Sequence, residues 1–200
     1  MTHPRTADHP IEPLFLDRWS PRSFLPESMP QADLETVLEA ARWAPSAFNI
    51  QPWHFLYAQR DSAQWELFVS VLDAFNRRWA ADAAVLVLLL SDTLMPGEGG
   101  RPDRPSTLNS FDAGAAWAQL ALQATALGYQ AHAMAGIDRD HARGALAVPA
   151  RFKIEIAIAL GLRGPAERLP EPLRVREKPS GRKPLAEIAT AGGFRAERAA

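Results

Sequence analysis

The run AAVLVLLL, residues 83–90, is the feature of this sequence that most restricts its fold. Its apolar residues follow one another without polar alternation, which is typical of a strand buried on both faces of a sheet. The run is far shorter than the ~20 apolar residues that a membrane-spanning helix needs. The sequence therefore predicts a sheet with helices around it.

The other expected elements are shorter or more amphipathic. Leu34, Val37, Leu38 and Ala41 recur at helical spacing before Pro45, which ends that helix. Further helices are expected at 62–79, 111–129 and 138–148, and further strands at 53–58, 130–136 and 152–162. One face of the helix 62–79 would hold Trp65, Phe68, Val69, Leu72 and Phe75, and one face of the strand 152–162 would hold Ile154, Ile156 and Ile158. Gly128 would end the helix 111–129. Another helix could approach that helix closely at its small residues Ala113, Ala116, Ala121 and Ala124.

Two segments rich in proline and glycine interrupt this pattern. Residues 92–110 form a long loop, and loops of this length are usually functional lids or disordered segments. The segment after Gly161 has five prolines up to residue 184 and no apolar periodicity, so it is expected to be disordered or to lie extended on another surface. The prediction is one α+β domain over residues 1–200, with an extended C-terminal arm and flexible tails at 1–10 and 190–200.

Composition excludes several classes of function. The absence of cysteine removes disulfides, thiolate nucleophiles and cysteine-based metal sites, and the five histidines have no ligand spacing, so no metal is expected. The formal net charge of −1 gives no general attraction to nucleic acid or to an anionic membrane. No signal peptide is recognisable, and a cytoplasmic protein is expected. The common motifs of serine hydrolases, phosphate-binding loops, dinucleotide folds and zinc proteases are absent.

The first polar cluster lies near the N-terminus. Arg18, Ser20 and Arg22 alternate with Trp19 and Pro21, so in an extended segment they point to one side. Two guanidinium groups and a hydroxyl suit a phosphate, because arginine forms bidentate, charge-assisted hydrogen bonds. The alternative is a solvated pair of arginines near a helix end.

Two further clusters are weaker when taken alone. Ser46, Asn49 and Gln51 offer neutral donors and acceptors for a polyol chain or an imide-like ring edge, or they serve only the local turn. Gly136 would let the backbone approach a flat ligand, and the sequence GRKP at 181–184 adds two cations. From Arg163 onward there are nine Arg or Lys residues against five Asp or Glu, so the C-terminal segment is basic.

Taken together, five motifs resemble the nitroreductase family of FMN-dependent oxidoreductases. They are RWSPRSF at 18–24, APSAFNIQPWHF at 44–55, FNRRWAADAAVLV at 75–87, ALGY with MAGID at 126–138, and GRKPLAEI at 181–188. They occur in the family's order over residues 17–188. The resemblance implies a nitroreductase-like fold with a central, mostly antiparallel sheet, and an intertwined homodimer with FMN sites at the subunit interface.

The resemblance also implies the cofactor-binding residues, position by position. The segment that holds the phosphate, ribityl chain and pyrimidine edge would be Arg18, Trp19, Ser20 and Arg22. The loop supplied by the partner subunit would contain Pro45, Ser46, Ala47 and Asn49, with Gln51 nearby. The flavin ring would contact Asn76 and the backbone of Ala135 and Gly136. The phosphate would also bind Arg182, or Lys183 if the register differs by one.

Two positions depart from the family pattern. Trp79 stands where many relatives have a lysine near the flavin, and Ala47 stands where a second serine is frequent. Arg78 or Arg22 are the candidates to replace that lysine's charge. The implied activity is transfer of reducing equivalents from NADH or NADPH, through FMN, to a nitroaromatic, quinone or conjugated carbonyl by a ping-pong mechanism. A non-catalytic flavin-binding protein is the alternative, and whether residues 93–110 form a lid is left open.

Overall fold

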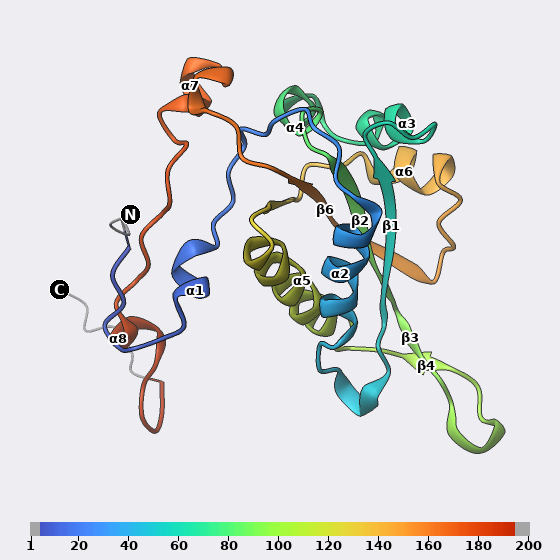
Figure 1. Cartoon of the computed structure of the whole chain (residues 1–200). Coiled ribbons are helices and arrows are strands. Elements are labelled where there is room, and N and C mark those ends of the chain that lie inside the picture. The colour runs from blue at the N-terminus through green and yellow to red at the C-terminus, as the bar shows by residue number, and fades with distance from the viewer. Residues whose placement is uncertain (1–4, 195–200) are drawn as a thin grey trace.

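A four-stranded antiparallel sheet forms the centre of the protein, whose computed structural model describes residues 5–194 (Figure 1). The strand order is β1 (Trp53–Gln59), β2 (Val85–Asp92), β6 (Phe152–Gly161) and β5 (Gln130–Met134). The predicted strand buried on both faces is confirmed, because β2 lies between β1 and β6 and is buried along nearly its whole length. The α+β class and the antiparallel sheet are confirmed as well.

The side chains of β2 divide between two hydrophobic clusters, one on each face of the sheet. Leu86, Leu88 and Leu90 belong to one cluster, and the residues between them belong to the other. The prediction that Ile154, Ile156 and Ile158 share a face is wrong. The β2–β6 register shifts between Leu89 and Leu90, so Ile154 packs in the first cluster and Ile158 in the second. A bulge breaks the alternation on which that prediction depended.

Helices α2 (Gln31–Arg42) and α5 (Asn109–Ala126) cover one face of the sheet and contact each other. The four alanines expected to permit a close approach are each at most 1 % exposed, in the same cluster as Leu34 and Val37 of α2. Gly128 has φ +86°, a conformation that suits glycine, just after the end of α5. The small side chains of α5 therefore set the spacing of this layer.

Helices α3 (Trp65–Ser70), α4 (Ala74–Ala80) and α6 (Arg139–Ala145) pack against the opposite face. The single helix predicted over 62–79 is wrong, because the chain breaks between α3 and α4. Leu72 forms a β-bridge with Ile137. The Asp73 side chain then caps the start of α4 by accepting a hydrogen bond from the backbone N–H of Asn76. After this break Phe75 leaves the predicted apolar face and is 48 % exposed.

The predicted loop 92–110 contains a short hairpin. Strand β3 (Leu94–Met95) pairs with β4 (Arg104–Pro105), and the 3-10 turn η2 (Glu98–Gly100) lies between them. The hairpin projects away from the sheet beside the 47–49 turn η1 (Ala47–Asn49) (Figure 1). Whether it acts as a lid stays a prediction.

The two terminal segments run side by side, away from the sheet (Figure 1). The N-terminal segment contains α1 (Pro13–Asp17), and the C-terminal one contains η3 (Ala166–Arg168), α7 (Glu171–Arg174) and α8 (Leu185–Ile188). Leu169 and Leu173 join the core, whereas residues 180–194 are exposed. The predicted flexible tails lie partly outside the described residues, at 1–4 and 195–200, and their flexibility stays a prediction. No helix in residues 5–194 has the length and hydropathy to span a membrane.

Candidate functional site

A cavity of about 370 Å³ gathers cationic side chains from both ends of the chain. The predicted alternation at its edge is present, because Trp19, Pro21 and Ser23 are buried while Arg18, Ser20 and Arg22 are partly exposed. Among the described residues, no Asp or Glu lines the cavity. Its lining residues are Arg5, Arg18, Trp19, Ser20, Arg22, His132, Arg176, Lys178, Ser180 and Arg182.

The arginines of this cavity repel one another. Burial lowers the pKa of Arg18, and the nearby charge of Arg182 lowers it further. Burial also lowers the pKa of Arg5, as do Arg182 and Arg18. The Nη1 of Arg5 donates to the backbone carbonyls of Leu16 at 3.2 Å and Arg18 at 2.8 Å, which fixes its position. A site with this concentration of positive charge favours an anion.

The backbone of Arg22 is held in place by Glu177. The Glu177 carboxylate accepts hydrogen bonds from the backbone N–H groups of Arg22 at 2.8 Å and Ser23 at 2.9 Å. Burial and the charge of Arg176 lower the pKa of Arg22, whereas Glu177 raises it. The Nε atoms of Arg5 and Arg22 are buried and have no hydrogen-bond partner among the described residues. Such donors are satisfied when a ligand oxygen occupies the cavity.

Trp79 and His132 form the apolar floor beneath Arg22. Trp79 is 2 % exposed, and its ring centroid lies 4.6 Å from that of His132 and 5.9 Å from the Arg22 guanidinium carbon. Because the Pro21 carbonyl can only accept, the His132 Nδ1, 2.8 Å away, carries the proton. Burial lowers the pKa of His132 to about 4, so the ring is neutral near pH 7.

Asn76 and Gly136 are brought together at the start of α4. The Asn76 Nδ2 donates to the Gly136 carbonyl at 3.3 Å, and the Asp73 backbone N–H donates to the same oxygen at 3.1 Å. A Cβ on Gly136 would lie 2.0 Å from Asp73 Oδ2 and 2.4 Å from Asn76 Nδ2. The space on the Cβ side of Gly136 is therefore filled by side chains at the start of α4, and the approach of its backbone to a flat ligand stays a prediction. The backbone carbonyl of Ala135, the residue before Gly136, accepts a hydrogen bond from Arg139 Nη1 at 3.3 Å.

The loop after Pro45 lies outside the cationic cavity. The Gln51 backbone N–H donates to Ser46 Oγ at 2.9 Å, and the Gln51 side chain donates to the Asn49 carbonyl at 3.1 Å. Phe48, Asn49 and Gln51 have φ values of 53°, 55° and 54°, which strain residues other than glycine. The buried carboxylate of Asp112 accepts from the Ala47 N–H at 3.2 Å and secures the loop to α5. Ser46 and Gln51 therefore form hydrogen bonds within the turn itself.

The predicted residues therefore fall into separate groups within one chain. Arg18, Trp19, Ser20, Arg22 and Arg182 share the cationic cavity. Lys183 lines an adjoining cavity of about 750 Å³ between the terminal segments, together with Arg182. Asn76 and Gly136 form the second group, and Ala47 lines a third cavity of about 350 Å³ with the hairpin residues Met95 and Arg104.

Several residues of the cavity were not predicted from the sequence. Arg176, Lys178 and Ser180 come from the C-terminal segment, where the excess of basic residues was the available signal. Arg5 and His132 belong to no recognisable motif, and only the fold brings them to the cavity. Within residues 5–194, no three His, Asp or Glu side chains are grouped as metal ligands.

This chain is similar to several known proteins. The model of the nitroreductase family matches residues 16–67 and 58–162. A crystal structure of an oxidoreductase containing FMN is 46 % identical with a TM-score of 0.94, and the match covers 98 % of this chain and 99 % of that one. An NADH dehydrogenase of Thermus thermophilus is 27 % identical over 78 % of this chain and 89 % of its own length. A CLA biosynthesis enone reductase of Lactiplantibacillus plantarum is 25 % identical over 78 % of this chain and 86 % of its own length.

Proposed function

The chain belongs to the nitroreductase family, and on that premise we propose that it is an FMN-dependent oxidoreductase that takes electrons from NADH or NADPH. The observation that carries this proposal is the cavity in which five arginines and a lysine converge, without a lining carboxylate among the described residues. A phosphate monoester carries about −1.5 to −2 charges at neutral pH, which suits such a cavity. The proposal also draws on the 46 % identical oxidoreductase containing FMN.

The residues of the cavity fit the phosphate end of this cofactor. Arg18 and Arg182 would offset its charge, and Arg5 would add a third guanidinium, already fixed by the carbonyls of residues 16 and 18. Ser20 would donate its hydroxyl; its Oγ lies 3.4 Å from Arg18 Nη1. The unpartnered Nε of Arg5 supports this fit, since an anionic oxygen would satisfy it.

At the ring end, this chain would supply orientation rather than a nucleophile. When bound, FMN itself supplies hydride and electron transfer. Asn76 holds the Gly136 carbonyl, and no described residue accepts a hydrogen bond from the Gly136 backbone N–H, which would be available to the ring. The absence of cysteine and of a serine triad agrees with chemistry that the cofactor carries out.

The proposed acceptors are nitroaromatics, quinones or conjugated carbonyls. We infer a ping-pong cycle, in which the nicotinamide leaves before the acceptor takes its place. The enone reductase among the relatives supports the carbonyl class. A non-catalytic flavin-binding protein is the second candidate. The departures from the family pattern at Ala47 and Trp79 support it, since Trp79 is buried and brings no charge.

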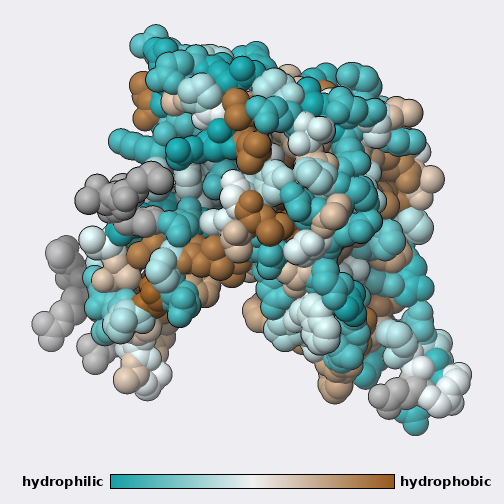
Figure 2. Space-filling view, viewed as in Figure 1, coloured by the Kyte–Doolittle hydropathy of each residue, from teal (hydrophilic) through white to brown (hydrophobic). Residues whose placement is uncertain are grey.

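A homodimer would complete this site. The loop at 45–51 does not reach the cationic cavity of its own chain, and its Phe48 is 84 % exposed. Phe15 of α1 and Ile188 of α8 are also exposed, at 54 % and 68 %. Hydrophobic residues line the hollow between these terminal segments and the body (Figure 2). Large exposed apolar surfaces usually mark interfaces, and a two-fold partner would cover them. A cytoplasmic location remains part of the proposal.

The deciding experiment is anaerobic mixing of the purified, FMN-loaded protein with NADH or NADPH. The flavin absorbance band should bleach with one or both nucleotides and return when a quinone or nitroaromatic is added. If the protein binds FMN but neither nucleotide bleaches it, the binding-protein alternative holds. If the protein binds no FMN, both candidates are refuted. Light scattering of the same sample tests the dimer.

A further inference from the structure

His132 is a buried residue of β5 that also lines the cationic cavity. The centroid of its ring lies 4.6 Å from that of Trp79, which supports the imidazole from the core. The protonated Nδ1 donates to the Pro21 carbonyl at 2.8 Å, so the neutral ring has its lone pair at Nε2. Within residues 5–194, Nε2 forms no hydrogen bond. Nε2 is therefore the ring nitrogen that a molecule in the cavity can use.

The imidazole is neutral near pH 7. Burial is the main cause that lowers its pKa to about 4; the Pro21 carbonyl raises this pKa, the charge of Arg22 lowers it, and the Ser20 carbonyl raises it. The nearby carboxylate of Glu177 is not part of the cavity lining. Its Oε1 accepts from the backbone N–H of Arg22, and its Oε2 is buried without a partner among the described residues. His132 is thus an uncharged acceptor that faces the cavity.

The other polar side chains of the cavity are mainly donors. Arginine and lysine have no acceptor atom. The hydroxyl oxygens of the lining serines already accept from arginines, Ser20 Oγ from Arg18 Nη1 at 3.4 Å and Ser180 Oγ from Arg182 Nη1 at 3.1 Å. In the described part of the lining, His132 offers a side-chain acceptor that no donor engages. A ligand that matches the whole cavity therefore carries a neutral hydrogen-bond donor as well as a negative charge.

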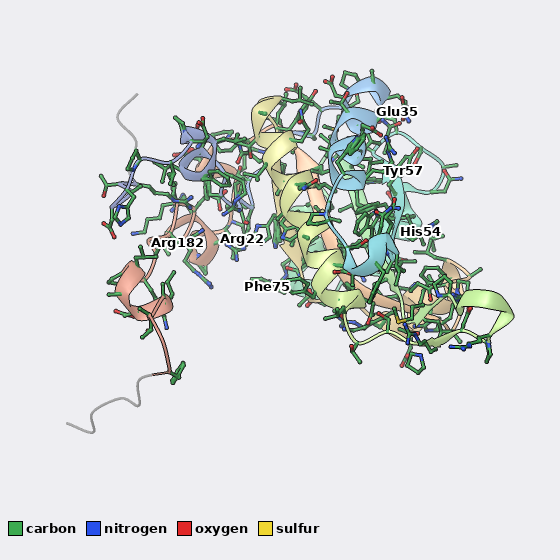
Figure 3. All side chains as sticks on the ribbon, turned by 90° about the horizontal axis from the view of Figure 1, so that it is seen from below. Arg22, Glu35, His54, Tyr57, Phe75 and Arg182 are labelled. Atoms are coloured by element: carbon green, nitrogen blue, oxygen red, sulfur yellow. The ribbon has the colours of Figure 1, made fainter. Side chains whose placement is uncertain are left out.

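The position of His132 indicates which donor it meets. Figure 3 shows Arg22 and Arg182 on the same side of the molecule, so the segment at 18–22 and the C-terminal segment face one ligand. Arg18 is proposed to bind the phosphate, and His132 binds the carbonyl of Pro21, three residues further along. Three extended residues span about 10 Å. His132 therefore lies beyond the phosphate group, where the polyol chain of FMN follows it.

We propose that His132 Nε2 accepts a hydrogen bond from a hydroxyl group of the ribityl chain of FMN and so fixes the course of that chain through the cavity. This inference rests on the proposed function. It gives a place in the cofactor site to a residue of β5 that belongs to none of the family motifs. Riboflavin, which has the chain and no phosphate, makes the same contact. Lumiflavin, which has the ring and no polyol chain, does not make it.

The test is the Kd of FMN, riboflavin, lumiflavin and inorganic phosphate, measured on cofactor-free protein. Fluorescence titration serves for the flavins, and competition with FMN serves for phosphate. His132→Phe keeps a ring against Trp79 and removes the acceptor, His132→Leu removes both, and His132→Gln restores an acceptor oxygen. His54→Phe is the matched control, because His54 is exposed on β1 and lies away from Arg22 and Arg182 (Figure 3).

The Kd values of FMN and riboflavin should each rise about tenfold in H132F and H132L, because one hydrogen bond is lost. Those of lumiflavin and inorganic phosphate should stay within about twofold. H132Q should bring FMN and riboflavin back to within about threefold of the unchanged protein, which H54F should match. Urea unfolding identifies the variants that fold. In the unchanged protein, the nitrogen NMR signal of His132 Nε2 should move when riboflavin is added and should not move with inorganic phosphate.

Three results would overturn the inference. An equal loss for riboflavin and lumiflavin would assign the hydrogen bond to the ring. A loss for all four probes would make His132 a structural residue. Unchanged Kd values in the variants that fold, or an Nε2 signal that riboflavin does not move, would exclude the contact. If FMN binds and NAD(P)H bleaches it, these results contradict this inference alone; if the unchanged protein binds no flavin, the proposed function is refuted as well.

Discussion

Replacing Arg18 by Gln is expected to change cofactor affinity and the stability of the cofactor-free protein in opposite directions. In the cofactor-free protein, burial and Arg182 lower the pKa of Arg18, so its positive charge is unfavourable in the folded state. Gln removes this charge and keeps a polar side chain of similar length. The free energy of unfolding should therefore stay the same or rise by up to about 0.5 kcal/mol.

The affinity for FMN should fall steeply in the same variant. Two unit charges 4 Å apart interact by about 4 kcal/mol at an effective dielectric constant of 20. Removing one partner of a desolvated charge pair typically costs about 2–5 kcal/mol. At about 1.4 kcal/mol for each factor of ten, this corresponds to a Kd roughly 30 to 4,000 times larger.

The assay is fluorescence titration of FMN into the cofactor-free protein, with urea unfolding of the same preparations. Arg78→Gln is the control, because Arg78 is exposed and lies outside the cavity lining. The loss in R18Q should shrink as salt screens the charges. The reasoning is refuted if R18Q keeps its Kd within about threefold of the unchanged protein, or if its cofactor-free form loses more than about 1 kcal/mol of stability.

Three other substitutions test other parts of the structure. Phe48→Gly should leave the free energy of unfolding of a monomer almost unchanged, or raise it by up to about 1 kcal/mol, because glycine adopts a φ of 53° without strain and little buried surface is lost. Urea unfolding at low protein concentration checks this. His132 has a lower pKa in the folded protein than in the unfolded chain, so the free energy of unfolding should fall as pH falls from about 6.5 to about 4. His132→Gln should flatten this part of the pH profile of unfolding. Gly136→Ala should push Asp73 away, weaken the start of α4 and lower FMN affinity, measured by titration.

The parts that could be predicted from the sequence are those encoded by neighbouring residues. The unbroken apolar run predicted that β2 is buried on both faces, and the alternation at Arg18–Arg22 predicted that Arg18, Ser20 and Arg22 share one side of the segment. The paired motifs predicted the family. In contrast, periodicity alone missed the break before α4, because Asp73 and the bridge from Leu72 to Ile137 outweigh the helical pattern.

The sequence by itself determined the buried strand, the presence of helices around a sheet and the family, since burial patterns and turn residues act over a few positions. Only the tertiary structure decided how the cationic cavity is assembled. The backbone of Arg22 binds Glu177, 155 residues further along the chain, and this contact brings Arg176 beside Arg22. The bulge at Glu155 and the burial of Trp79 were decided in the same way. Pairing between residues distant in sequence depends on the geometry of the folded chain, and no local pattern records it.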